Sequence, residues 1–403
     1  MGAAMFSSFV SRLIVALINV AILVACARYL GVSSRGEISI FLFGISLIQM
    51  ASEVFTGYSV VHFLPRVNQR RLIFSGYVFV FFASLFAAAL LFLSGKMLPG
   101  LAVETWLIAL LVLINTFHCI ILLGRSQLHL FNLVSIIQPA FLLLGILAYV
   151  FLLNIYTFKA FFSPLIFSFL IGSFISGTLV VKTPMGISKQ PLPMREIITN
   201  GMLYQGMLLM HFLCIRYTYF LLPDSKTVGL YASGTAIAES ALLVSGSIAP
   251  LILSGVANNE VNEENVSRTI QLSGAGVVFS LLVITLLILI PEPWLLSLLG
   301  EGFMGIKQVL WAYAPGVIML SLFIPLSQFF SAKGQQLLSL KCYTPGFLFT
   351  IFMAPFFTSK YGIMGAAINA DLSLLIVATG MMIAFKQSNH LQWRSIFAWP
   401  FRR

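Results

Sequence analysis

Long apolar stretches alternate with short polar loops along almost the whole chain of 403 residues. Each stretch has about 20 residues, the length that an α-helix needs to cross the ~30 Å hydrocarbon core of a bilayer at 1.5 Å per residue. Inside lipid every backbone polar group must be paired within its own segment, so the stretches are predicted to be helices. By this length criterion we expect about twelve spans: roughly 6–28, 38–62, 72–94, 104–124, 133–154, 160–181, 197–221, 228–254, 268–291, 308–331, 341–358 and 364–385.

Composition supports the same class of protein. Hydrophobic residues make up 59% of the chain and charged residues only 9%, whereas soluble domains carry about a quarter charged residues. The mean hydropathy is +1.00. We therefore predict an all-α polytopic membrane protein. The first apolar run has no basic leader and is followed by another span, so we expect no cleavable signal peptide.

The net charge of +11 is informative about topology. When the loops are assigned alternately to the two sides of the membrane, one side receives roughly twice as many lysines and arginines as the other. The positive-inside rule then predicts that both termini are cytoplasmic. The basic residues are scattered over short loops and form no single patch, which argues against a nucleic-acid partner.

A proline-rich polar segment, KTPMGISKQPLPMR from Lys182, divides the spans into two sets of six. Three prolines and a glycine make it a poor helix and a good cytoplasmic linker. RYLGVSSRGEISIF from Arg28 and FLLPDSKTVGLYASG from Phe220 form a weak internal repeat, typical of transporters built from two similar halves. The expected domains are an N-terminal six-helix lobe (1–181), the linker (182–196), a C-terminal six-helix lobe (197–385) and a basic cytoplasmic tail (386–403).

Two arginines, Arg12 and Arg216, lie inside the first span of each half. A charge at that depth costs at least ~2.5–3.5 kcal/mol and usually faces a partner or a watery cavity. By helical rise, Arg12 lies ~7 Å to the cytoplasmic side of the midplane and Arg216 ~10 Å to the periplasmic side. One hypothesis is that they are two successive binding sites for an anionic head group that crosses the membrane, because guanidinium binds phosphate bidentately and stays charged. The alternative is that each snorkels to its nearer interface or is neutralised by an acid.

Each half also carries a glutamate in its second span, Glu53 and Glu239. They are candidate ion-pair partners of the arginines or sites for a coupling ion, H⁺ or Na⁺. Gln49 lies one turn before Glu53, and Asn19 lies two turns after Arg12. These spacings give each helix a polar stripe that can line a cavity, so Asn19 and Gln49 join the arginines as candidate substrate-binding residues.

Other polar residues have simpler interpretations. His118 and His211 lie in mid-span, where an interhelical hydrogen bond is the usual role. Asp371 receives no role, and the four cysteines read as small hydrophobic residues. The sequence shows no phosphate-binding glycine loop, no metal-ligand spacing and no nucleophile elbow. We therefore expect no catalytic residues, no metal and no cofactor, and we predict that the chain is not an enzyme.

Three segments carry a resemblance to a known family. ARYLGVSSRGEISIF from Ala27 resembles the first loop of the polysaccharide or oligosaccharide-lipid flippases (the O-antigen or capsule repeat-unit type). A later segment, WLLSLLGEGFMGIKQVLWAYAPGVIMLSLFIPLSQFFSAKGQQ from Trp294, is similar to the family's glycine-acid-phenylalanine turn, the helix after it and the alanine-basic-glycine exit. The third, YGIMGAAINADLS from Tyr361, resembles the family's entry to its final helix. These flippases belong to the multidrug/oligosaccharidyl-lipid/polysaccharide exporter superfamily, which is MATE-like.

The resemblance implies a V-shaped fold of two lobes that works by alternating access. Its implied substrate is an undecaprenyl-diphosphate-linked oligosaccharide, flipped from the cytoplasmic to the outer leaflet for surface polysaccharide biosynthesis. The implied location is the plasma (inner) membrane of a bacterium, with the lipid bilayer as a partner. A coupling H⁺ or Na⁺ and the polysaccharide polymerase machinery are further partners that stay open. Two alternatives also stay open, a cation-coupled multidrug exporter of the same superfamily and a membrane glycan polymerase or ligase.

Overall fold

The computed structural model describes residues 2–57, 59–64, 67–95, 100–184, 190–257 and 263–392, and every regular element in these ranges is helical. The elements are α1 (Gly2–Ala25), η1 (Cys26–Leu30), α2 (Gly31–Ser52), α3 (Ser59–Phe63), α4 (Gln69–Leu93), α5 (Ala102–Gly124), α6 (Leu128–Phe151), α7 (Lys159–Lys182), α8 (Met194–Arg216), η2 (Tyr217–Phe220), α9 (Ser225–Glu239), η3 (Ser240–Leu242), α10 (Leu243–Ala257), α11 (Glu263–Leu289), α12 (Glu292–Leu299), η4 (Glu301–Phe303), α13 (Ile306–Ala332) and α14 (Gln336–Ser388). The predicted all-α, multi-pass membrane fold is confirmed.

Within the described residues, 10 continuous helical stretches are long and apolar enough to span a membrane. Two of them are far longer than a bilayer requires, with 43 residues over Val10–Ser52 and 53 residues over Gln336–Ser388. The first joins α1 to α2 through the π-helical turn η1. The second breaks at Gly362, which has a backbone φ of 56°. Residues that carry a Cβ rarely adopt this angle. Each long stretch thus contains two successive spans, which is compatible with the twelve that hydropathy predicts.

Some predictions fall on residues that the structure does not describe. These are 185–189 of the expected linker, 393–403 of the expected basic tail, and the loop cations Arg66, Lys96, Lys189, Arg394, Arg402 and Arg403. The chain divides into two compact units, Met1–Leu209 and Met210–Arg403. Their boundary lies inside α8, later than the linker at 182–196 that the sequence predicts. The division into two sets of six spans stays a prediction.

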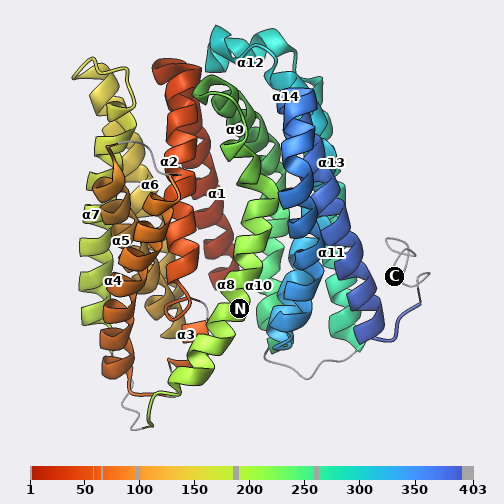
Figure 1. Cartoon of the computed structure of the whole chain (residues 1–403). Helices are drawn as coiled ribbons and strands as arrows, with labels where there is room; N and C mark the ends of the chain where they lie inside the picture. Colours follow the sequence, from red (N-terminus) through yellow and green to blue (C-terminus); the bar gives the residue numbers. More distant parts are fainter. Residues whose placement is uncertain are drawn as a thin grey trace. The chain divides into compact units, whose positions relative to one another are not determined.

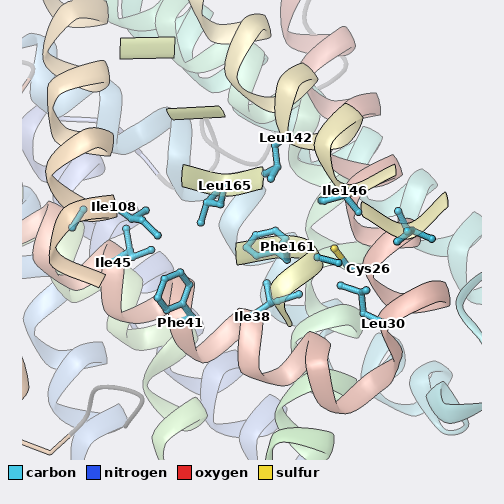
Figure 2. Packing of buried hydrophobic residues seen from close by; sticks show 14 of the residues in the cluster. Cys26, Leu30, Ile38, Phe41, Ile45, Ile108, Leu142, Ile146, Phe161 and Leu165 are labelled. Atoms are coloured by element: carbon cyan, nitrogen blue, oxygen red, sulfur yellow. The ribbon is translucent and has the colours of Figure 1, made fainter. Parts of the chain in front are cut away.

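Unit 1 is a helical bundle around an apolar core (Figure 2). Helix α1 packs on α6, α6 on α7 and α7 on α5, and α5 contacts both α2 and α4. The core side chains come from all six of these helices and from η1; they include Cys26, Leu30, Ile38, Phe41, Ile45, Ile108, Leu142, Ile146, Phe161 and Leu165. Cys26 packs here as a small apolar residue, and all four cysteines are free thiols.

A chain of polar side chains ties three helices of unit 1 together. Tyr77 Oη and His118 Nε2 lie 2.6 Å apart, and His118 Nδ1 lies 2.7 Å from Ser176 Oγ. Ser176 Oγ also donates to Asn115 Oδ1 at 3.2 Å. The interhelical hydrogen bond predicted for His118 is therefore confirmed, and it links α5 to α4 and α7. Such bonds strengthen helix association in a membrane, where burial of apolar surface does not drive it.

Arg125, which follows α5, clamps the ends of two other helices. Its Nη1 donates to Val180 O and to Thr183 Oγ1, both at 2.6 Å, at the end of α7. Its Nε donates to Gln69 Oε1 at 3.1 Å, at the start of α4. The last carbonyl groups of a helix have no hydrogen-bond partner within the helix and carry partial negative charge. A guanidinium supplies both the hydrogen-bond donor and the positive charge that these groups favour.

Replacing Arg125 by methionine is expected to destabilise unit 1 by about 2 kcal/mol, because the Val180 carbonyl and the Thr183 hydroxyl lose a charged donor. The measurement is the thermal unfolding midpoint of the purified protein in detergent. Arg195→Met, which removes an equal charge from an exposed position at the start of α8, is the control and should leave the midpoint unchanged. Equal midpoints for the two variants would contradict the stabilising role of the Arg125 hydrogen bonds.

Unit 2 is organised around α13, which contacts α9, α10, α11 and α14 (Figure 1). Large rings fill the centre of this bundle: Tyr313, Phe323, Phe329 and Phe330 of α13 are all fully buried. Phe329 meets Phe385 of α14 with ring centroids 5.0 Å apart. Because α13 is surrounded on most sides, a residue on it can reach polar groups on several helices.

Many large apolar side chains are exposed, as a membrane protein requires. Val278, Leu282, Leu286 and Leu289 recur along α11 at three- and four-residue spacing, and each is more than half exposed. This spacing places them on one face of the helix. An apolar face of this size would be a liability in water and suits contact with lipid.

Candidate functional site

The guanidinium of Arg216, the last residue of α8, lies in a frame of four polar side chains in unit 2. Its Nη2 forms an ion pair with Glu239 Oε2 at 2.5 Å. Its Nη1 donates to Tyr219 Oη at 2.9 Å and to Thr235 Oγ1 at 2.8 Å. Glu239 is in turn held by Tyr313 of α13, whose hydroxyl donates to Oε1 at 3.0 Å. The structure thus brings together Arg216 and Glu239, the arginine and the glutamate of the second half.

Helix ends explain why these residues meet. Arg216 closes α8 and Glu239 closes α9, so both project from positions where the chain changes its helical geometry, into η2 and η3 respectively. The start of α9 is anchored by Asp224, whose Oδ1 accepts the Thr227 N–H at 2.7 Å. That backbone hydrogen bond holds the pKa of the Asp224 carboxyl below its ordinary value. A capped α9 of 15 residues fixes the height at which Glu239 emerges.

The pair lies on the wall of a cavity of about 220 Å³ in unit 2. The lining residues are His211, Phe212, Ile215, Arg216, Glu239, Leu242, Leu320 and Ile324. The side chains of Arg216 and Glu239 remain 18% and 23% exposed, so both can reach a ligand in this space. The cavity is apolar apart from one cation, one carboxylate and one imidazole. This composition suits a ligand with a small charged group attached to apolar or weakly polar matter.

His211 departs from its prediction. Its ring makes edge contacts with Phe323 and Tyr343, with centroids 5.9 and 5.6 Å apart, and its buried Nδ1 has no hydrogen-bond partner. The predicted interhelical hydrogen bond is therefore wrong at this nitrogen. The reason is packing, because the neighbouring helices present aromatic faces to the imidazole.

The second polar cluster lies in unit 1, where α2 ends. Gln49 Nε2 donates to Glu53 Oε1 at 2.7 Å, so two predicted residues lie together. Gln205 Nε2, from α8, approaches Glu53 Oε2 at 3.4 Å. The hydrogen-bond partners of Glu53 are thus two neutral amides and not Arg12. Gln205 is not among the residues predicted from the sequence; a buried amide inside an apolar span was the signal that could have identified it.

The remaining predicted residues are on α1 and α14. Arg12 and Asn19 both lie on α1 with exposed side chains, and their proposed roles stay predictions. Asp371 Oδ1 accepts the N–H of Gly316 at 2.9 Å, next to Pro315 inside α13. Because proline interrupts the backbone hydrogen bonds of a helix, this contact gives Asp371 a structural role.

Comparisons with known proteins identify the fold. No family model and no curated protein matches the chain. Among solved structures, the inward-facing form of a multidrug resistance MATE family transporter of the MOP superfamily is 16% identical, with a TM-score of 0.70, over 95% of this chain and 98% of that one. A MATE transporter in its straight conformation is also 16% identical, with a TM-score of 0.70, over 96% of each chain. The fold is that of the MATE transporters.

A third solved structure, a mutant of the Vibrio cholerae MATE transporter VcmN, extends this likeness to almost every residue. It is 14% identical, with a TM-score of 0.64, over 98% of this chain and 97% of that one. A structural likeness at this low sequence identity shows the fold alone and leaves the ligand to be argued from the site itself.

Proposed function

We propose that the chain is a flippase that moves an undecaprenyl-diphosphate-linked oligosaccharide from the cytoplasmic to the outer leaflet of a bacterial plasma membrane, for surface polysaccharide biosynthesis. The mechanism proposed is alternating access between the two sides of the membrane, with both termini in the cytoplasm. The MATE transporter fold supports transport, since the solved proteins with this fold are named as transporters. Fold alone does not select a cargo, so the cargo is argued from Arg216.

The observation that carries the proposal is the position of Arg216 on the cavity wall. Guanidinium is the side chain best suited to bind phosphate oxygens in pairs, and it keeps its charge at every physiological pH. Tyr219 and Thr235 hold Nη1 through neutral hydroxyls, so the geometry of the guanidinium does not depend on the carboxylate. Glu239 occupies the remaining face. In our proposal a phosphate of the cargo exchanges with Glu239, and the carboxylate restores neutrality when the cargo leaves.

A cation-coupled multidrug exporter is the second candidate. The observation that favours it is Glu239, a partly exposed carboxylate on the same cavity wall as the apolar side chains, in a fold shared with a multidrug resistance transporter. In that function a cationic drug or a coupling ion would displace Arg216 and bind to the carboxylate of Glu239. The two candidates therefore assign the ligand-binding role to opposite members of one ion pair.

Transport in reconstituted vesicles distinguishes the two candidates. We expect the purified protein to move a short-chain lipid-diphosphate oligosaccharide between leaflets, and to give no accumulation of a lipophilic cationic dye. The assay is run without a gradient and with imposed H⁺ or Na⁺ gradients, which also tests coupling. Dye transport without movement of the lipid-linked sugar would overturn the flippase and favour the exporter.

A further inference from the structure

Helix α12 presents large apolar side chains although it is not a membrane span. It joins α11 to α13 and lies crosswise at one end of the unit 2 bundle (Figure 1). Its 8 residues are too few to cross a bilayer, which needs about 20. Yet Trp294 is 71% exposed and Leu298, one turn later, is 48% exposed. A surface helix in water carries polar residues on its exposed side, so this apolar flank indicates another environment.

The side chains of α12 fall into three sectors, because successive residues of a helix are rotated by about 100°. Leu295 and Leu299 are 6% and 1% exposed and pack into the protein. Trp294 and Leu298 lie beside them on one flank. Ser297, which is exposed, lies on the side opposite the buried pair. A helix with an apolar flank and a polar outer side is suited to lie along a membrane surface.

The position of α12 along the membrane normal follows from α11. That helix has 27 residues and is therefore ~40 Å long, about 10 Å more than the hydrocarbon core. It begins with Glu263 and Glu264, which are both exposed, so the extra length lies at that end. Its lipid-facing stripe continues to the last residue, Leu289, which is 70% exposed. Because α12 begins three residues later, it lies where hydrocarbon gives way to head groups.

The segment around α12 is a built element that holds the flank in place. Glu292, the one charged residue of α12, accepts the N–H of Gly305 through Oε1 at 2.8 Å. Gly300 and Gly305 have φ angles of 104° and 89°, which glycine adopts without strain, and they turn the chain on either side of η4. Phe303 of η4 is 1% exposed. The carboxylate of α12 is thus used within the protein, and the flank of Trp294 carries no charge.

A second anchor lies on α14 at the same end of unit 2. Helix α13 leaves this end, and the first half of α14 returns to it before the break at Gly362. There Lys360 Nζ lies 5.6 Å from the ring centroid of Phe356 and 5.3 Å from that of Tyr361. Trp311, in the second turn of α13, is 58% exposed. Tryptophan and tyrosine concentrate at membrane interfaces, and lysine near helix ends extends towards the head groups.

We propose that α12 is an interfacial anchor whose Trp294 and Leu298 insert at the boundary between the head groups and the acyl chains of the bilayer. The flank continues the lipid-facing stripe of α11, which is why a lipid surface is its partner. Ser297 faces water in this arrangement. The anchor fixes the depth of the connected ends of α11 and α13 in the membrane. It does not rest on the cargo proposed above.

Depth-resolved quenching of Trp294 fluorescence tests the anchor. The other four tryptophans, Trp106, Trp311, Trp393 and Trp399, are replaced by phenylalanine, and the purified full chain is placed in phosphatidylcholine nanodiscs. Phosphatidylcholine brominated near the start of its acyl chains should quench Trp294 about twofold more than lipid brominated near their ends, because tryptophan prefers the interface. Aqueous iodide should quench Trp294 weakly.

Two reference positions calibrate the depth after Trp294→Phe has removed the last native tryptophan. Leu282→Trp lies on the lipid-facing stripe about 10 Å from the end of α11 and should be quenched most by the deep bromines. Ser297→Trp, on the outer side of α12, should be quenched mainly by iodide. In the protein that keeps Trp294, Leu298→Asp should shift the emission to longer wavelength, whereas Ser297→Asp should leave it unchanged.

Three results would overturn the proposal. In the first, iodide quenches Trp294 as strongly as it quenches Ser297→Trp and neither brominated lipid has an effect, so that α12 projects into water. In the second, deep bromines quench Trp294 as strongly as Leu282→Trp, which places the flank inside the hydrocarbon. In the third, Leu298→Asp and Ser297→Asp give the same emission. If the protein with one tryptophan does not fold, the difference between the wild-type protein and Trp294→Phe supplies the signal.

Discussion

Replacing Arg216 by glutamine is expected to lower the rate of lipid-diphosphate transport by about tenfold to a hundredfold, the range that a charge-assisted hydrogen bond of 1.5–3 kcal/mol corresponds to. The loss arises because the cavity of unit 2 would keep its apolar lining but lose the cation that lines it. Arg216→Lys should recover only part of the rate, since an ammonium has the charge but not the planar fork. Initial rates in reconstituted vesicles, normalised to the amount of inserted protein, provide the measurement.

Glu239→Gln should have the opposite effect in a flippase. The variant frees Nη2 of Arg216 from its ion pair while Tyr219 and Thr235 still hold Nη1. We expect lipid-diphosphate transport to be maintained and the apparent affinity for the anionic cargo to rise. In a cation exporter the same substitution would abolish transport. Abolished lipid-diphosphate transport in Glu239→Gln, with Arg216→Gln active, would refute the assignment of the cargo to Arg216.

A double variant separates transport from folding. Breaking one side of a partly buried ion pair leaves the other charge uncompensated, which can cost several kcal/mol and reduce protein yield. The combination Arg216→Gln with Glu239→Gln removes both charges and keeps side chains that can hydrogen-bond. It should recover the stability that Arg216→Gln loses, yet remain inactive on lipid-diphosphate substrates. Recovery of transport in the double variant would show that Arg216 acts only by neutralising Glu239.

Gly201→Ala is expected to destabilise the protein by about 3 kcal/mol, the upper end for inserting a methyl group into a packed site. The new Cβ would meet the carbonyl oxygen of Val54 at 1.7 Å, and backbone atoms cannot move aside as a flexible side chain can. The displaced α8 would also carry Gln205 away from Glu53. The measurement is the thermal unfolding midpoint of the purified protein in detergent, which should fall.

Gly246→Ala is the matched control for that substitution. Gly246 also lies within a helix, α10, but nothing lies within 4 Å of an added Cβ. Alanine is a better helix former than glycine by up to about 1 kcal/mol, so this variant should be neutral or slightly more stable. A loss of stability in Gly246→Ala equal to that in Gly201→Ala would show that the effect of Gly201→Ala is not specific to the contact with Val54.

Much of the fold could be predicted from the sequence because the bilayer imposes a simple rule. A helix must cover the hydrocarbon core and satisfy its own backbone, so length and hydropathy are enough to locate α4, α5, α6, α7, α11 and α13. The rule fails where a helix changes form without leaving the apolar run. Hydropathy alone could not show that η1 joins α1 to α2 without a break, or that the boundary between the two compact units lies inside α8.

The candidate sites could be predicted only in part. Arg216 and Glu239 were recognisable because a charge in an apolar span is costly and therefore informative. Their neutral partners were not, because Tyr219, Thr235 and Tyr313 are common in membrane helices and carry no charge to mark them. The pairing of Glu53 was also beyond the sequence. Gln205 lies 152 positions away in the chain, and only the glycine contact between α8 and the end of α2 brings the two together.

The sequence by itself thus determined that this is a multi-pass helical membrane protein and which ionisable residues lie at membrane depth, since both follow from the cost of exposing polar groups to lipid. Only the tertiary structure decided which partner each charge has. That choice depends on helix packing at the scale of a single methyl group, where Gly201 permits one contact and the rings around His211 prevent another. Hydropathy averages over about 19 residues and cannot carry that information.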